Sequence, residues 1–193
     1  MKGSDLAAKI IRVVTVPAVT SGCAMTMLWL SETQIYLRGL DYWMVMLGLT
    51  GIPLLSYVIS ALVPRLHAKG REGQRKTAMY FSAAGYVLAF LYALLMPTTG
   101  AYRVITGTYV ISILLLLLLN KGMHFKASGH ACSTAGPLVA AGYFLGGWTI
   151  PAGLVVCGLV IWSSMKLKQH RFWELMTGSA VSGVAFVCLA MLL

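Results

Sequence analysis

Seven apolar stretches joined by short polar connections make up most of this sequence. Stretches of about 17–25 apolar residues are typical of helices that cross a membrane. Hydrophobic residues form 59% of the chain and charged residues only 10%, which excludes a water-soluble domain of this length. We therefore predict an all-α fold, a polytopic transmembrane helix bundle of six to seven spans. The stretches lie at about 10–30, 42–63, 78–96, 103–119, 130–147, 149–164 and 174–193.

The polar connections are too short to hold a soluble domain. We expect residues 1–193 to form a single transmembrane domain, whose motif-bearing core covers about residues 64–193. The four cysteines fall singly within or near apolar stretches, without the spacing of metal ligands or of a disulfide framework. The acidic residues form no cluster suited to magnesium. We expect no metal, no cofactor and no nucleic-acid partner.

Basic residues are distributed very unevenly between the two faces of the predicted bundle. If the stretches cross the membrane alternately, the N-terminus and the connections at 64–77, 120–129 and 165–173 share one face, which we name the basic face. Thirteen of the fifteen Lys and Arg residues lie there, and only Arg38 and Arg103 lie opposite. Topology explains this, because Lys and Arg accumulate on the cytoplasmic side. Topology is the more common cause of such a bias, but convergence on an anionic ligand such as phosphate also explains it, and the two explanations are compatible.

Glu174 is the only carboxylate side chain between residues 73 and 193. An ionised carboxylate at the edge of the hydrocarbon is costly unless it is paired, so it marks a candidate functional site. His170 precedes it by four residues, and positions i and i+4 share one face of a helix. The carboxylate can bond one imidazole nitrogen and orient the other as a nucleophile or a metal ligand. The alternative is a helix-start glutamate that caps backbone N–H groups beside an incidental histidine.

A second polar segment, Lys126-Ala127-Ser128-Gly129-His130, precedes the small-residue stretch at 131–147. Ser128 is suited to cap the helix that follows, and Gly129 lets the backbone approach a ligand closely. The N–H groups at the start of that helix offer donors to a phosphate, with His130 in the first turn. The alternative is an ordinary Ser-Gly helix start.

Together with the segment 163–174, these residues resemble the type 2 phosphatidic acid phosphatase superfamily of membrane phosphatases. That family carries Pro-Ser-Gly-His at the start of one helix. It then carries Ser-Arg, five residues, His, three residues and Asp at the junction of its last two helices. The match covers roughly residues 120–193, and its matching residues are Ser128, Gly129 and His130 in the first motif and Ser163, His170 and Glu174 in the second.

The chain departs from the family pattern at several positions. Ala127 stands in place of the proline, Ser164 in place of the arginine and a glutamate in place of the aspartate. The family's Lys, six residues and Arg-Pro motif is missing, because the chain contains no Arg-Pro dipeptide. Lys126, or Arg71 and Arg75 on the same face, are candidates to supply the missing cation. Loss of the arginine at position 164 removes a bidentate phosphate clamp that a lysine reproduces poorly.

The resemblance implies a metal-independent phosphatase whose substrate is a lipid or polyprenyl phosphate or diphosphate. It implies that His170 is the nucleophile and forms a phosphohistidine, that Glu174 orients its ring, and that His130 acts as acid and base. The remaining site residues that it implies, all for phosphate binding, are Lys126, Ser128, Gly129, Ser163, Arg71 and Arg75.

Two other functions are compatible with the sequence. One is a catalytically weak or inactive binder or carrier of anionic lipids, which the serine at position 164 favours and the retained histidines oppose. The other is a haem or metal protein that uses His124, His130 and His170, although these lie near the ends of the predicted helices. A membrane location is common to all three functions.

We expect a multi-pass protein of the cell (inner) membrane. The charge distribution places the basic face in the cytoplasm, whereas the family usually works on the outer leaflet or in the lumen. The sequence therefore leaves open the side of the membrane that the site faces. In this interpretation Lys2, Lys9 and Arg12 lie outside the site and report only on topology.

Overall fold

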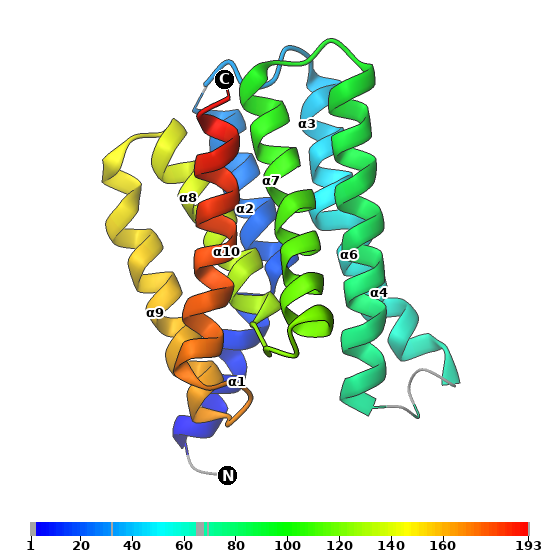
Figure 1. Cartoon of the computed structure of the whole chain (residues 1–193), viewed down its shortest axis with the longest axis vertical. Coiled ribbons are helices and arrows are strands. Elements are labelled where there is room, and N and C mark those ends of the chain that lie inside the picture. The colour runs from blue at the N-terminus through cyan, green and yellow to red at the C-terminus, as the bar shows by residue number, and fades with distance from the viewer. Residues whose placement is uncertain (1–2, 32, 65–67, 69, 193) are drawn as a thin grey trace.

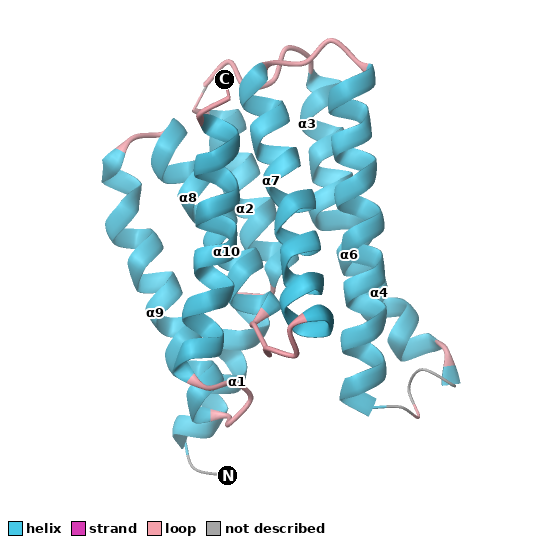
Figure 2. Cartoon of the chain, viewed as in Figure 1, coloured by secondary structure: helices cyan, strands magenta, loops and turns pink. Residues whose placement is uncertain are grey.

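The computed structural model describes residues 3–31, 33–64, 68 and 70–192, apart from the side chains of residues 71 and 72. Throughout this part of the chain the regular secondary structure is helical, as predicted, and there is no strand (Figure 2). The α-helices are α1 (Gly3–Val14), α2 (Pro17–Leu30), α3 (Gly39–Met46), α4 (Ile52–Leu62), α6 (Gly70–Leu95), α7 (Gly100–Leu117), α8 (Gly129–Phe144), α9 (Ile150–Lys166) and α10 (Phe172–Ala190). The π-helical turns η1 (Leu47–Gly51) and η2 (Leu118–Gly122) continue α3 and α7, and the 3-10 turn η3 (Gly147–Thr149) precedes α9.

Five helical segments of the described chain are long and apolar enough to cross a membrane, and the bent pair α1 and α2 makes a sixth if it counts as one span. The chain is therefore an integral membrane protein by length and composition of its helices. The one expected span without a counterpart among these segments, at 130–147, corresponds to α8, which has only 16 residues. A helix of that length reaches about 24 Å and is shorter than a typical hydrocarbon core. The five segments are Gly39–Leu62, Gly73–Leu95, Gly100–Gly122, Gly147–Lys166 and Phe172–Ala190.

The first predicted span, at 10–30, is broken into two helices. Their axes differ by 53°, and the break falls just before Pro17, the first residue of α2. Proline has no N–H and pushes the preceding residue away from the helical conformation, and Val16 is accordingly extended, with ψ 134°. α1 packs against α9, so it lies at one end of the bundle instead of continuing α2 (Figure 1).

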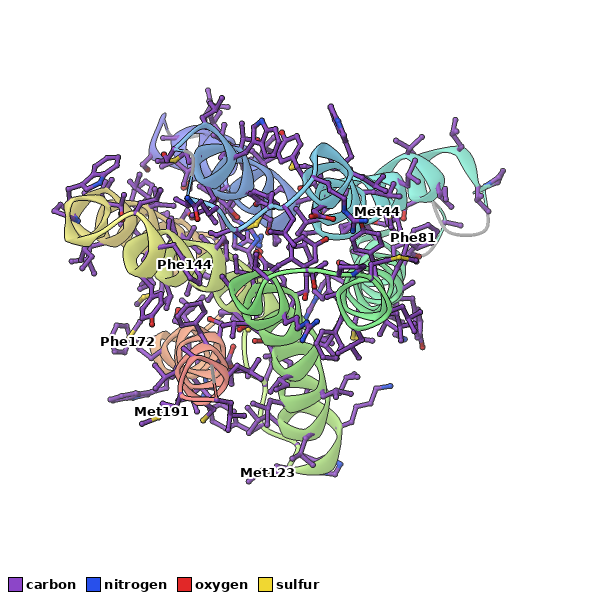
Figure 3. The ribbon with its side chains drawn as sticks, turned by 90° about the horizontal axis from the view of Figure 1, so that it is seen from above. Met44, Phe81, Met123, Phe144, Phe172 and Met191 are labelled. Atoms are coloured by element: carbon purple, nitrogen blue, oxygen red, sulfur yellow. The ribbon has the colours of Figure 1, made fainter. Side chains whose placement is uncertain are left out.

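α8 is enclosed by other helices and carries the second polar segment at its start. It packs mainly against α10, α2 and α9, and eight of its residues are buried. Seen from above, α9 and α4 lie at opposite edges of the bundle, and the labelled side chains of Phe172 and Met123 lie on its outside (Figure 3). The start of α8 is thus held from several sides by protein.

The connections divide between the two ends of the bundle as the alternating pattern predicted. Figure 1 shows the N-terminus, the start of α6 and the α7–α8 and α9–α10 connections toward one end, which carries the basic face. The α2–α3, α6–α7 and α8–α9 connections and the C-terminus lie at the opposite end (Figure 1). The polar segments around His130 and His170 therefore share one end of the molecule.

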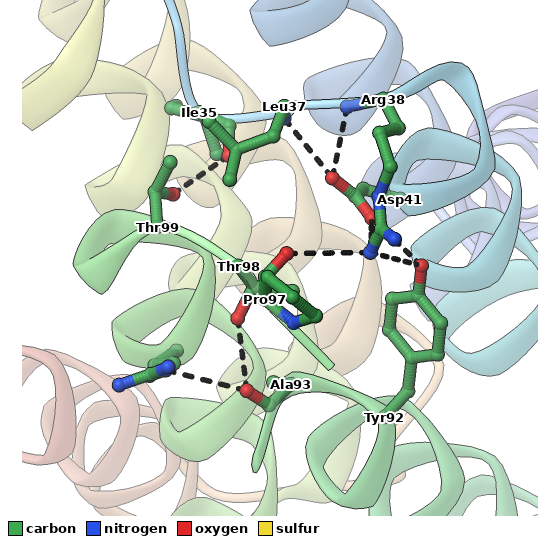
Figure 4. Close-up of polar contacts among 10 residues, drawn as sticks. Ile35, Leu37, Arg38, Asp41, Tyr92, Ala93, Pro97, Thr98 and Thr99 are labelled. Carbon is green, nitrogen blue, oxygen red and sulfur yellow. Dashed lines mark hydrogen bonds and ion pairs between the residues drawn. The ribbon is translucent and has the colours of Figure 1, made fainter. Parts of the chain in front are cut away.

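At the opposite end, the carboxylate of Asp41 belongs to a closed network of hydrogen bonds (Figure 4). Asp41 is fully buried and accepts bonds from the Tyr92 hydroxyl, at 2.7 Å, and from the Arg38 guanidinium, at 3.0 Å. The backbone N–H groups of Leu37 and Arg38 each donate to its other oxygen at 3.0 Å. A buried carboxylate with this many donors serves the structure, because it joins the start of α3 to α6.

Candidate functional site

His170 and Glu174 form the central contact of the candidate site. The Nδ1 atom of His170 lies 2.7 Å from Oε2 of Glu174, and the side chains are only 8% and 16% exposed. His170 lies in the connection between α9 and α10, and Glu174 lies in the first turn of α10. The same carboxylate oxygen accepts the N–H of Arg171 at 3.3 Å. Both interpretations of Glu174 therefore hold together: it caps the helix start and it orients the imidazole.

The bond to Glu174 fixes which nitrogen of His170 is available for chemistry. Nδ1–H donates to the carboxylate, so Nε2 carries the lone pair. Burial lowers the pKa of His170 below its ordinary value, Glu174 partly opposes this, and the positive charges of Lys126 and Arg75 add to the lowering. His170 is therefore a neutral imidazole at neutral pH, which is the form that a nucleophile requires.

The start of α8 is built as the sequence predicted. The fully buried Ser128 is the N-cap residue, and its hydroxyl accepts the N–H of Ala131 at 3.3 Å. A Cβ atom at Gly129 would meet only Leu116, at 4.0 Å, so the packing of the protein does not itself require glycine there. The space beside Gly129 leaves the backbone N–H groups of the first turn open to approach by a ligand.

The backbone of Ser128 connects the polar segment at 126–130 to the segment at 163–174. Its N–H donates to the carbonyl oxygen of Glu174 at 2.9 Å. One turn further along α10, a Cβ atom at Gly178 would overlap the carbonyl oxygen of Ser128, so this approach requires glycine. These contacts hold the first turn of α8 against the first turns of α10, and His130 and His170 are close enough to interact electrostatically.

Lys126 joins the two connections that carry the histidines. Its Nζ donates to the carbonyl oxygen of Gln169 at 3.4 Å, and its positive charge reaches both His170 and Glu174. Arg75, exposed on α6, also contributes positive charge at His170. The side chain of Arg71 lies outside the described residues. Three of the predicted residues with catalytic roles and two of the predicted cations thus gather at one place.

Ser163, one of the predicted phosphate ligands, bonds within its own helix. It is fully buried in the last turns of α9, and its hydroxyl donates to the carbonyl oxygen of Val160 at 3.1 Å. Serine in a helix commonly bonds back to its own preceding turn in this way. In this structure the hydroxyl hydrogen is used within α9, and the phosphate contact of Ser163 stays a prediction.

Arg12 belongs to the site, although its position in the sequence was interpreted as a sign of topology. Its Nη1 donates to the hydroxyl of the fully buried Ser164 at 2.6 Å. Its charge also reaches His130. The signal was available, because Arg12 falls inside the first apolar stretch, and an ionisable residue within such a stretch marks a functional site by default. It was missed because the break between α1 and α2 folds α1 back against α9.

Thr15 connects the same segment to His130. Its hydroxyl donates to the carbonyl oxygen of Ile11 at 2.7 Å, and its oxygen lies 3.4 Å from Nε2 of His130. The shorter bond takes the hydroxyl hydrogen, so Nε2–H of His130 is the donor in the longer contact. The inner side of α1 and the residue after it therefore touch both α8 and α9 at the site.

A metal centre receives no support from the arrangement of ligands. Among the described residues, no three His, Cys, Asp or Glu side chains lie together in a group that would hold a metal ion. His124 is exposed in the connection before α8 and has a φ of 54°. The histidine-ligated alternative stays a hypothesis, because a haem can be held by fewer than three side chains.

Comparisons with known proteins leave the resemblance as a hypothesis based on motifs. No family model, no curated protein and no solved structure matches the chain. The observations that bear on function are therefore those of the site itself. These are an oriented imidazole, a second imidazole nearby and several cations around one carboxylate.

The close approach at Gly178 generates a prediction about stability. Gly178→Ala should destabilise the protein by about 1–3 kcal/mol, because the added methyl group must push Ser128 away from α10. Gly183→Ala, on the same helix, is the matched control, since a Cβ atom there meets nothing within 4 Å. Thermal unfolding in detergent measures both. Equal unfolding temperatures for the two variants would contradict the described contact.

Proposed function

We propose that the chain is a membrane-embedded phosphatase that hydrolyses a lipid or polyprenyl phosphate or diphosphate through a phosphohistidine, without a metal. The observation that carries the proposal is the 2.7 Å contact between His170 and Glu174, with His130 within electrostatic range. An imidazole held by a carboxylate on one nitrogen and open on the other is the arrangement that nucleophilic catalysis by histidine requires. The family resemblance points to the same chemistry.

In the first step, Nε2 of His170 attacks the phosphorus atom in line with the bond to the lipid oxygen. The N–P bond forms as the P–O bond breaks, and His130 gives its proton to the departing lipid oxygen. The imidazole of His170 becomes positively charged, and the carboxylate of Glu174 stabilises that charge through Nδ1–H. Partial burial beside Arg12 favours the neutral form of His130 in the free protein, and the approach of a phosphate anion makes its protonation favourable.

In the second step, a water molecule attacks the phosphorus of the phosphohistidine. His130, which is now neutral, takes a proton from the water, the N–P bond breaks and inorganic phosphate leaves. His170 returns to its neutral form with Nε2 again open. One water molecule is consumed, and His130 recovers the proton that it held in the complex with the phosphate, which it loses again when the free protein is restored.

Positive charge and backbone donors supply the rest of the proposed catalysis. Lys126 and the backbone N–H groups of Gly129 and His130, at the start of α8, are placed to bind the equatorial oxygens of the phosphate. Positioning and electrostatic stabilisation account for most of the rate enhancement in phosphoryl transfer. The site lies at one end of an apolar bundle, so a phosphate carried on a membrane anchor reaches it at the depth of the headgroups.

Substitutions of the pair test the proposed nucleophile. His170→Ala should reduce phosphate release from lipid phosphates by about 10⁴-fold or more, and Glu174→Gln by about 10²-fold or more, because the imidazole loses its orienting charge. His124→Asn is the matched control, since His124 is exposed on the same face and asparagine tolerates its positive φ. Phosphate release by purified protein is the measurement. Lipid binding without release by the wild-type protein would favour the alternative of an inactive carrier.

The second imidazole has a separate signature. His130→Ala should accumulate phosphoenzyme on a labelled lipid phosphate, because hydrolysis of the intermediate loses its general base. The label should be stable to alkali and lost in acid, as a phosphohistidine is. Steady-state turnover equal to that of the wild-type protein would exclude the acid and base roles of His130.

The pH dependence follows from the environment of His170. Because its pKa is lowered, the neutral nucleophile persists at pH values below the ordinary pKa of histidine, and activity should decline only at a still lower pH. Glu174→Gln removes the charge that raises this pKa, so the acidic limb of kcat/KM should move to lower pH while the maximum falls. If the acidic limb moves to higher pH in this variant, the limb does not report the titration of His170.

A further inference from the structure

We propose that Arg12 is a phosphate-binding residue of this site, delivered to it by α1 from the other end of the sequence. The inference rests on the proposed function and names a specific group that holds the phosphate. It assigns to the first helix a direct part in the site, in addition to its part in membrane attachment.

Contacts on two helices place Arg12 at the site. Its guanidinium donates to the hydroxyl of Ser164 in the last turn of α9, at 2.6 Å, and its charge reaches His130 at the start of α8. Three residues further along, Thr15 contacts His130. α1 packs along α9, and Ala8 is fully buried on the same side of α1. The position of the guanidinium is thus fixed by packing and by hydrogen bonding together.

The chemistry of the group suits a phosphate. A guanidinium carries five N–H donors in a planar fork, so it can serve a protein hydroxyl and two oxygens of one phosphate together. Among the side chains that the structure describes, the site brings Arg12, Lys126 and Arg75 near Glu174, which is bonded to His170. A cluster of cations of this kind attracts a phosphate dianion.

The outer side of α1 indicates where the phosphate comes from. Large apolar side chains with about half or more of their surface exposed cover that side, and they are Leu6, Ile10, Val13 and Val14. An amphipathic helix of this kind lies in the membrane interface with its apolar side toward the acyl chains. Arg12 therefore lies between the interface and His130, where it can bind the headgroup of a membrane-anchored phosphate.

The test compares Arg12 variants of the full chain with a matched control on the same helix. Arg12→Ala should lower phosphate release from a lipid phosphate in mixed micelles by about 10²-fold, and Arg12→Lys should fall between it and the wild type. Lys9→Ala removes an exposed positive charge from α1 and should have little effect. The water-soluble p-nitrophenyl phosphate should show the same relative loss, because Arg12 binds the phosphate group itself. A loss confined to the lipid would overturn that role.

Anion binding provides a readout that does not depend on turnover. Orthovanadate should raise the unfolding temperature of the wild-type protein and of Lys9→Ala, and this rise should be lost in Arg12→Ala. If the wild-type protein releases no phosphate, the proposed enzymatic function fails, while the vanadate result still decides the role of Arg12. If the wild-type protein releases phosphate, and Arg12→Ala equals Lys9→Ala both in phosphate release and in the vanadate effect, the role of Arg12 is overturned. The proposed phosphatase activity is then unaffected.

A relocated guanidinium tests the geometry even if Arg12→Ala folds poorly. Because the guanidinium of Arg12 lies against the side chain of Ser164, an arginine at position 164 can bring the same group to nearly the same place. The double variant Arg12→Ala/Ser164→Arg should therefore recover at least about tenfold over Arg12→Ala in phosphate release and should restore the vanadate effect. The proposal is overturned if the double variant shows no recovery and Arg12→Lys releases phosphate at the wild-type rate.

Discussion

The close approach of the Ser128 backbone to the first turns of α10 is the contact on which the candidate site depends. The N–H of Ser128 donates to the carbonyl oxygen of Glu174, and the carbonyl oxygen of Ser128 lies where any side chain at Gly178 would be. The N-cap bond of Ser128 to Ala131 then fixes the start of α8 relative to the same point. Through these few atoms, the helix that carries His130 and the turn that carries His170 become one rigid unit.

Two carboxylates of the described chain, Asp41 and Glu174, are bonded differently at opposite ends of the bundle. Asp41 is enclosed by the Tyr92 hydroxyl, the Arg38 guanidinium and two backbone N–H groups, which leaves it a structural role. Glu174 meets one imidazole and one backbone N–H, and its partner His170 keeps one nitrogen open. Burial makes an unpaired charge costly in both places, but only the second arrangement ends in a group that can react.

The proposed site draws its residues from both halves of the chain. α1 supplies Arg12, and the last three helices and their connections supply Lys126, His130, His170 and Glu174. α1 packs along α9, with exposed apolar side chains on its outer side and the contact of Arg12 with Ser164 on its inner side. This arrangement supports a substrate whose phosphate remains attached to a membrane anchor while it is bound.

The sequence by itself determined the helical class, the alternation of the connections and the pairing of His170 with Glu174. The first two follow because an apolar stretch must satisfy its backbone internally in lipid. The pair forms by a different local rule from the expected helical spacing: Glu174 is the N3 residue of α10 and turns back past the N-cap to His170, which precedes the helix. It also predicted the cap at Ser128. It did not predict that Pro17 would end a helix within one apolar stretch, or that α8 would be too short to count as a span.

Only the tertiary structure decided that Arg12 lies beside Ser164. Arg12 and Ser164 are separated by 152 positions, and no local pattern relates two residues so far apart. Their contact results from the 53° bend between α1 and α2, which lays α1 along α9. Helix formation is a property of neighbouring residues, whereas the meeting of a guanidinium with a distant hydroxyl depends on how whole helices pack.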